Sequence, residues 1–227
     1  MSFCLPKKRL NNEDELLSRC QTIEGFSFSQ LALALQLTIP QVPVQRKGWL
    51  GLAVELALGT TAGNKAIPDF AHLGIELKTL PLNEKGKPAE STFVTSIPLL
   101  TIHQQDWLSS QCYAKLKRVL WLPIEGDKKL SFAERRIGRA FLWSPTQEEE
   151  QALKEDWQEL TQMIAMGSLD EINASMGEFL QIRPKAANAK SLCYGFGNDG
   201  IKTLTLPRGF YLRARFTEQI LKANGYK

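Results

Sequence analysis

The chain has 227 residues, of which 43% are hydrophobic and 23% charged, with a formal net charge of +4 at pH 7. This composition is typical of a globular protein with a sizeable core, and it excludes a disordered or low-complexity chain. The longest apolar run, LALALQLTI, is far shorter than the roughly 20 residues of a membrane span. The first residues lack a signal-peptide pattern, and the four cysteines are widely spaced without a CxxC pair. We therefore expect a cytoplasmic protein with reduced thiols, no zinc site and no membrane association.

The pattern of apolar residues predicts helices first, then strands, then both. Helices are expected at 12–23, at 27–37, where Ser27 and Gln30 form a capping-box pattern, and at 48–59. Strands are expected at 74–82, 93–100 and 117–126, followed by a helix at 147–166, a strand at 179–184, a strand and turn at 202–212, and a closing helix at 216–225. Because there is no internal repeat or low-complexity linker, residues 1–227 are predicted to form a single α/β domain, a mixed β-sheet flanked by helices.

Two charged side chains, Glu76 and Lys78, interrupt the alternating strand GIELKTLPL. Side chains on a strand alternate between its two faces, so both charges point to one face, while Ile75 and Leu77 point to the other and can enter the core. Asp69 precedes this strand and can lie on an adjoining turn or a paired strand. The three charged residues are therefore expected to meet, with the Asp69 carboxylate beside that of Glu76.

Two carboxylates that converge without a counter-ion repel each other. A Mg²⁺ ion relieves the repulsion, because this hard cation binds one or two carboxylates together with water and phosphate oxygens. Metal-bound water is more acidic, and the cation offsets the charge that builds up on a phosphate under attack. Lys78 can orient the water or stabilise that charge. Asp69, Glu76 and Lys78 thus indicate a site that cleaves phosphodiesters; the alternative is a solvated salt bridge on a half-exposed strand.

Glu55 lies within the almost wholly apolar segment WLGLAVELALG. A glutamate there is either at the solvent edge of the helix or buried with a partner, because an unpaired buried carboxylate is energetically expensive. If the helix packs against the strand that bears Glu76, Glu55 becomes a third carboxylate at the site.

Positive charge is concentrated late in the chain. Between Arg183 and Arg215 there are seven basic residues and one acid, Asp199, so this stretch carries +6 and the rest of the chain −2. A positive segment in a nearly neutral protein is typical of an anion-binding face, and a duplex of nucleic acid is the usual large anion. A solvated basic surface is the alternative.

These motifs together resemble the PD-(D/E)xK nuclease superfamily, through Pro68-Asp69 and Glu76-Leu77-Lys78. More narrowly, the blocks KGWLGLAVELALG, DFAHLGIELKTLPL, KLKRVLWLPIEG, LQIRPKAANAK and TLPRGFYL resemble the MutH family of DNA mismatch-repair endonucleases, in order from about residue 47 to residue 213. Long blocks of this kind are more specific than three charged residues. The resemblance implies a restriction endonuclease-like fold with a DNA-binding cleft between two lobes.

The resemblance also implies an activity. Members of that family bind GATC sites in double-stranded DNA and nick the unmethylated strand on the 5′ side of the G; they need Mg²⁺ and are activated by MutL, which mismatch-bound MutS recruits. Carried over by position, Asp69, Glu76 and Lys78 are the catalytic trio, with Asp69 and Glu76 as ligands of Mg²⁺, for which Mn²⁺ or Ca²⁺ can substitute. Glu55 is a supporting carboxylate, and Lys115 matches a lysine near the active site.

The methylation state of adenine is displayed in the major groove, where the N6 methyl group protrudes. Rejecting that group requires a rigid surface with no room for another carbon. A tyrosine is suitable, and the resemblance gives this role to Tyr211, which could otherwise be a core aromatic at a strand end.

Other side chains suit the remaining DNA contacts. Arg183 and Lys185 fit guanine edges or phosphates, and the resemblance favours Arg183. The arginines at 208, 213 and 215 fit phosphates, which hold register and make binding sensitive to salt. Lys47 and Phe93 are further expected DNA contacts, with core packing as the alternative for Phe93.

Three functions compete at this point. The first is a mismatch-repair endonuclease that nicks one strand and acts as a monomer, since a symmetric dimer tends to cut both strands. The second is a GATC-directed restriction-type endonuclease, which needs a second catalytic unit. The third is a methylation-sensing DNA-binding module without catalysis, against which the intact trio of Asp69, Glu76 and Lys78 argues.

Overall fold

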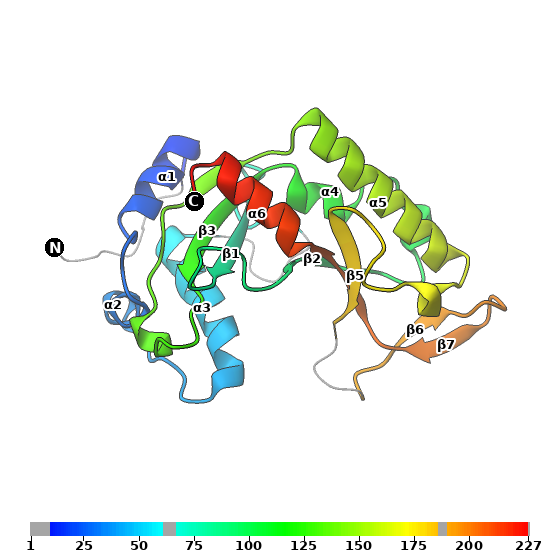
Figure 1. Ribbon diagram of the computed structural model, residues 1–227, viewed down its shortest axis with the longest axis horizontal. Coiled ribbons are helices and arrows are strands. Elements are labelled where there is room, and N and C mark those ends of the chain that lie inside the picture. The colour runs from blue at the N-terminus through cyan, green and yellow to red at the C-terminus, as the bar shows by residue number, and fades with distance from the viewer. Residues whose placement is uncertain (1–9, 61–66, 186–189, 227) are drawn as a thin grey trace. The chain divides into compact units, whose positions relative to one another are not determined.

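The computed structural model describes residues 10–60, 67–185 and 190–226 (Figure 1). The chain forms two compact units, each assembled from separate stretches of sequence. Unit 1 comprises Met1–Ala89, Val119–Trp143 and Tyr226–Lys227, and unit 2 comprises Glu90–Arg118 and Ser144–Gly225. Cys4 and four residues of the IRPKAANAK block, 186–189, lie outside the described residues. The predicted single domain with a cleft between two lobes stays a prediction.

The helices of unit 1 follow the predicted order and are α1 (Glu13–Gln21), α2 (Phe28–Leu35) and α3 (Pro43–Leu58). The capping box at α2 is confirmed, because the Ser27 hydroxyl accepts from the Gln30 amide and the Gln30 side chain accepts from the Ser27 amide. Helix α3 begins five residues before the predicted start. Its first turn carries Pro43, whose fixed φ suits a helix start. The residues before Trp49 are mostly exposed and lack the apolar periodicity that indicates a helix, so the sequence did not predict the earlier start.

Unit 1 also contains a mixed three-stranded sheet in the order β1-β3-β4. Strand β1 (Glu76–Leu82) runs parallel to β3 (Val119–Glu125), with Glu76 opposite Val119, and β4 (Phe141–Trp143) runs antiparallel to β3. The core of the unit contains apolar residues of all three helices and of this sheet region. Representative members are Leu16, Leu31, Ala53, Val54, Ile75, Leu120 and Leu122. The predicted mixed sheet with helices packed on it is therefore confirmed.

Unit 2 contains an antiparallel sheet in the order β2-β8-β5 and a separate hairpin of β6 and β7. The strands are β2 (Thr92–Ser96), β5 (Leu180–Pro184), β6 (Cys193–Phe196), β7 (Lys202–Thr205) and β8 (Arg208–Leu212). The helices are α4 (Gln111–Leu116), α5 (Gln147–Ala165) and α6 (Ala214–Ala223). Residues 202–212, predicted as a strand and a turn, form two strands, because the chain breaks at Pro207, which has no amide to donate.

Short 3-10 helices complete the description: η1 (Ile102–Gln104) and η3 (Leu169–Glu171) in unit 2 and η2 (Phe132–Glu134) in unit 1. Across residues 10–60, 67–185 and 190–226, no helix combines the length and the apolar character needed to cross a bilayer.

Candidate functional site

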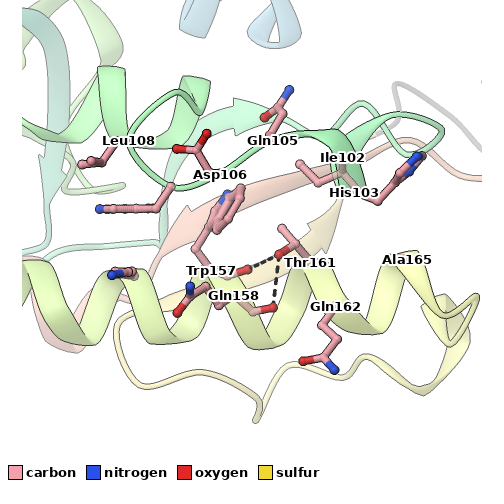
Figure 2. Close-up of a pocket in the computed structure, with 12 residues that line it drawn as sticks. Ile102, His103, Gln105, Asp106, Leu108, Trp157, Gln158, Thr161, Gln162 and Ala165 are labelled. Carbon is pink, nitrogen blue, oxygen red and sulfur yellow. Dashed lines mark hydrogen bonds between the residues drawn. The ribbon is translucent and has the colours of Figure 1, made fainter.

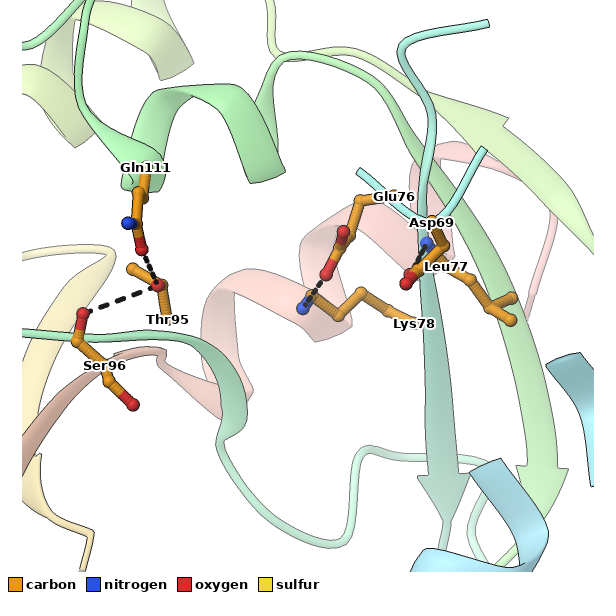
Figure 3. A network of polar contacts seen from close by, with 7 residues as sticks. All are labelled: Asp69, Glu76, Leu77, Lys78, Thr95, Ser96 and Gln111. Carbon is orange, nitrogen blue, oxygen red and sulfur yellow. Dashed lines mark hydrogen bonds and ion pairs between the residues drawn. The ribbon is translucent and has the colours of Figure 1, made fainter. Parts of the chain in front are cut away.

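A tight turn places Asp69 against the start of β1. Phe70 and Ile75 form an antiparallel bridge, with the Phe70 amide 2.9 Å from the Ile75 carbonyl, and Gly74 supplies the positive φ of 69° that closes the turn. The chain thereby returns on itself, and the Asp69 Oδ2 accepts a hydrogen bond of 2.8 Å from the Leu77 amide (Figure 3). The carboxylate of Asp69 therefore lies beside the strand that bears Glu76 and Lys78, from the adjoining turn that the sequence allowed.

Glu76 and Lys78 form a buried ion pair. Their side chains project from the same side of β1, with Lys78 Nζ 2.8 Å from Glu76 Oε1, while the Leu77 side chain points to the other side (Figure 3). Glu76 is 3% exposed and Lys78 is 9% exposed. The alternative of a solvated pair on a half-exposed strand is therefore wrong, because this strand is covered on the face that carries its charges.

Burial makes the two charges depend on each other. Removing both from water is expensive, and removing only one leaves the other buried without compensation, typically at about 3–5 kcal/mol. A pair of this kind is weak evidence for stability and stronger evidence for a site where charge is needed. It is also a local arrangement, since the two residues are neighbours on one face of one strand.

Glu55 lies on α3, beside the apolar stripe that packs into the core of unit 1. That stripe includes Ala53, Val54, Ala57 and Leu58, and Glu55 itself is half-buried at its border. In the described part of the chain, no three acids, histidines or cysteines are grouped so that they could hold a metal ion together. Helix α3 and Ile75, the residue before Glu76, belong to the same core, and the role of Glu55 as a supporting carboxylate stays a prediction. The two-carboxylate ligand set stays a prediction.

The predicted DNA-reading side chains of unit 2 come from adjacent strands. Tyr211 of β8 lies opposite Phe93 of β2 on one side and opposite Gln181 of β5 on the other. Tyr211 and Phe93 are half-buried, whereas Arg183 and Lys185 are exposed. Both aromatics therefore keep part of their surface at the sheet face, next to exposed cations, and neither is a fully buried core residue.

Three further predicted residues have distinct positions. Lys47 lies within α3 and is exposed, Lys115 is in the last turn of α4 and half-buried, and Arg208 begins β8 and is half-buried. Lys115 and Arg208 belong to unit 2, whereas Lys47 belongs to unit 1 together with the trio. The roles predicted for these lysines and this arginine stay predictions.

Two arginines expected to contact phosphates are bonded to the protein's own backbone. Arg213 donates to the carbonyls of Met176 and Gly177, and Arg215 donates to the carbonyl of Glu178 at 2.7 Å. Burial lowers the pKa of Arg213, and the positive charge of Arg215 lowers it further. These guanidinium groups hold the turn before β5 in place, which the sequence did not indicate.

Sequence reasoning also missed a side chain that orients Arg183. The Ser91 hydroxyl accepts a hydrogen bond of 2.7 Å from Arg183 Nη1. The two residues are 92 positions apart, so no local pattern could have linked them.

A pocket of about 510 Å³ in unit 2 contains none of the predicted site residues. It lies between the segment 102–108 and α5, and the Trp157 ring points from the helix toward that segment (Figure 2). The Thr161 hydroxyl is within hydrogen-bond distance of the Trp157 and Gln158 carbonyls, which keeps it on the helix. The predicted chemistry and this pocket are therefore separate features.

Comparison with known proteins identifies relatives along nearly the whole chain. The family described as DNA mismatch repair enzyme MutH matches residues 58–156. The DNA mismatch repair protein MutH of Vibrio campbellii is 49% identical over 215 residues, which cover 95% of this chain and 95% of the relative. The proteins of the same name from Pasteurella multocida and Escherichia coli O127:H6 are 49% and 47% identical, over 92% of this chain and 95% and 91% of their own lengths. With the Asp69 turn and the charged strand β1 in place, the chain belongs to the MutH family of DNA mismatch repair enzymes.

Proposed function

We propose that this protein is a Mg²⁺-dependent endonuclease that nicks the unmethylated strand of hemimethylated GATC sites, on the 5′ side of the G. The observation that carries the proposal is the buried Glu76–Lys78 pair next to the Asp69 carboxylate. These are the residue types that phosphodiester cleavage requires, and they lie within one strand and its preceding turn. Family membership supports the same activity.

The donor chemistry at the start of β1 fits a hard divalent cation. Asp69 and Glu76 would hold Mg²⁺ through carboxylate oxygens, which this ion prefers, and Mn²⁺ or Ca²⁺ can take the same place. When bound, the cation makes a coordinated water more acidic and offsets negative charge on the scissile phosphate. We assign Glu55 to supporting this pair from α3.

Lys78 supplies a positive charge that needs no metal. Its ammonium group lies 2.8 Å from the Glu76 carboxylate, next to the proposed metal ligands. A cation in a buried site stabilises charge that develops on the phosphate, and it can orient the attacking water. Lys115 is assigned a secondary role in the same chemistry.

Recognition of the site is assigned to unit 2. Tyr211 is the surface that rejects the N6 methyl group of adenine, and Arg183 and Lys185 bind guanine edges or phosphates. Arg208 and Phe93 contribute to the same contact, and the exposed Lys47 of unit 1 contacts the DNA backbone. Binding is therefore expected to weaken as salt concentration rises.

The proposed partners follow from the repair pathway. MutL activates the nuclease and MutS, bound to the mismatch, recruits MutL. We propose that the protein acts as a monomer in the bacterial cytoplasm, because the chain carries one catalytic trio and one strand is cut.

The test is cleavage of a supercoiled plasmid with a single hemimethylated GATC site, with Mg²⁺ and with or without MutL and ATP. We expect open-circular product, nicked in the unmethylated strand, and faster nicking with MutL. A plasmid without GATC and a fully methylated plasmid are the controls. Linear product from one site would favour the restriction-type endonuclease, and binding without any cleavage would favour a methylation-sensing module.

A further inference from the structure

The side chains assigned to DNA recognition form one continuous row of contacts in unit 2. Lys185 Nζ lies 3.3 Å from the centre of the Phe93 ring, and the Phe93 and Tyr211 rings meet edge to face with centroids 5.3 Å apart. Arg183 Cζ lies 6.0 Å from the centre of the Tyr211 ring. The order along the row is Lys185, Phe93, Tyr211, Arg183, so a shift of Phe93 is transmitted to both of its neighbours.

The Phe93 ring packs against Gly209, a residue without a side chain. Gly209 of β8 is paired with Ser96 on β2 and with Arg183 on β5, and it is two residues from Tyr211 on the same face of the sheet. A Cβ atom at Gly209 would lie 2.8 Å from Phe93 Cε2, closer than real contacts allow, and 3.1 Å from the Thr95 carbonyl oxygen. The bare backbone at Gly209 is therefore the seat of the Phe93 ring.

The dihedral angles of Gly209 do not require a glycine. Gly209 is absent from the residues with positive φ in the described part of the chain, so an alanine could adopt its conformation. A glycine inside a strand weakens the strand and usually marks a close approach of another group. Here the approaching group is the ring that contacts Tyr211 and Lys185.

We propose that Gly209 is a positioning residue for methyl discrimination, acting through Phe93 on Tyr211. This inference rests on the proposed function, in which Tyr211 rejects the methylated adenine. A surface can exclude one methyl group only if it cannot retreat, and the edge-to-face contact with Phe93 limits the movement of Tyr211. An added methyl group at residue 209 displaces Phe93 from its seat, and Tyr211 gains the room that the N6 methyl group needs.

The test compares Gly209→Ala with a matched strand glycine of the same unit, Gly195→Ala. Gly195 lies in the other sheet of unit 2, where an added Cβ would be 3.2 Å from Thr205 Cγ2. The measurement is the ratio of nicking rates at unmethylated and fully methylated GATC sites, with the full-length protein, alongside DNA affinity and thermal unfolding. We expect Gly209→Ala to lower this ratio about tenfold, equal to about 1.4 kcal/mol, and Gly195→Ala to leave it unchanged.

A second variant keeps the inference testable if Gly209→Ala fails to fold. Phe93→Leu occupies the seat but removes the ring contact to Tyr211, and we expect it to lower the same ratio. A folded Gly209→Ala protein that discriminates as well as the wild type would overturn the inference, as would a Phe93→Leu protein with full discrimination. If the wild type itself nicks both substrates equally, the proposed function fails instead, so the two failures are distinguishable.

Discussion

Each unit contains one buried acid among the residues that the structure describes, and the two are bonded in different ways. Glu76 in unit 1 is 3% exposed and is bonded to the ammonium group of Lys78. Asp156 in unit 2 is 6% exposed, and its carboxylate accepts from the backbone amides of Glu178, Phe179 and Leu180 at 2.6 to 2.7 Å.

The difference separates a chemical site from a structural one. Backbone amides cannot leave the Asp156 carboxylate without moving the chain, so that charge fixes the turn before β5. The Lys78 side chain can rotate away from Glu76, so the carboxylate can exchange one positive partner for another. Burial of an acid alone therefore does not mark an active site; the kind of group paired with the acid distinguishes the two cases.

The largest expected effect is on cleavage, in a Glu76→Gln protein. This change keeps the shape of the side chain and removes its charge, so the proposed cation loses a ligand. We expect the nicking rate at GATC to fall by roughly 10³-fold, while DNA affinity changes little because the cations of unit 2 are untouched. The rate is measured on plasmid DNA, and affinity by fluorescence anisotropy in Ca²⁺. Nicking at the wild-type rate would remove Glu76 from the chemistry.

The next effect is on stability, in an Asp156→Ala protein. Three backbone amides, one of them fully buried, then lose their acceptor, and we expect the free energy of unfolding to fall by about 3 kcal/mol. Urea unfolding followed by circular dichroism measures the loss. Glu159→Ala is the matched control, since Glu159 is exposed on the same helix and should change stability by less than about 0.5 kcal/mol. Equal stability of the two variants would contradict the structural role of Asp156.

The sequence predicted features that depend on residues close together in the chain. Alternation placed Glu76 and Lys78 on one side of β1, and the capping box at Ser27 and Gln30 predicted the start of α2. Both depend on residues a few positions apart. Alternation does not tell whether the polar face of a strand meets solvent or protein, so the burial of the ion pair was not predictable.

Contacts between residues far apart in the chain could not be predicted from the sequence. Asp156 belongs to a helix with an acidic first turn, and its amide partners lie 22 to 24 positions later. Gly209 was part of a recognised block, LPRGFYL, but no pattern in the chain links it to the ring of Phe93. The strands β6 and β7 carry glycine and polar residues without strict alternation, and the sequence did not separate β7 from β8 within the strand and turn predicted at 202–212.

A smaller effect tests whether Lys78 and a divalent ion compete for the same carboxylate. In Lys78→Met the ammonium group is lost, so the buried Glu76 carboxylate loses this positive partner and should bind another cation more tightly. We expect Ca²⁺ to bind about tenfold more tightly and to raise the melting temperature more than in the wild type. Calorimetric titration and thermal unfolding measure both.

The control for that variant is an ion pair outside the site. Lys129 is paired with Glu84 at the surface of unit 1, with side chains 78% and 51% exposed. Lys129→Met should leave Ca²⁺ affinity unchanged, because solvent already screens Glu84. If both substitutions changed Ca²⁺ affinity equally, the effect would come from net charge and the proposed exchange at Glu76 would be wrong.

The smallest expected effect concerns the Cys20 thiol, an ionisable group that burial keeps protonated. Burial in α1 raises the pKa of the Cys20 thiol from 9.0 to about 12. Above pH 9 the unfolded chain loses this proton while the folded chain keeps it, so the folded state binds more protons and becomes less stable as pH rises. The stabilisation is complete below pH 9 and is lost as pH approaches 12. Cys20→Ala should remove this part of the slope when unfolding is measured from pH 8 to 10.5; an unchanged slope would mean that the thiol ionises as easily in the folded protein. The two buried acids thus have polar partners, an ammonium group for Glu76 and backbone amides for Asp156, whereas the Cys20 thiol is buried in its protonated form.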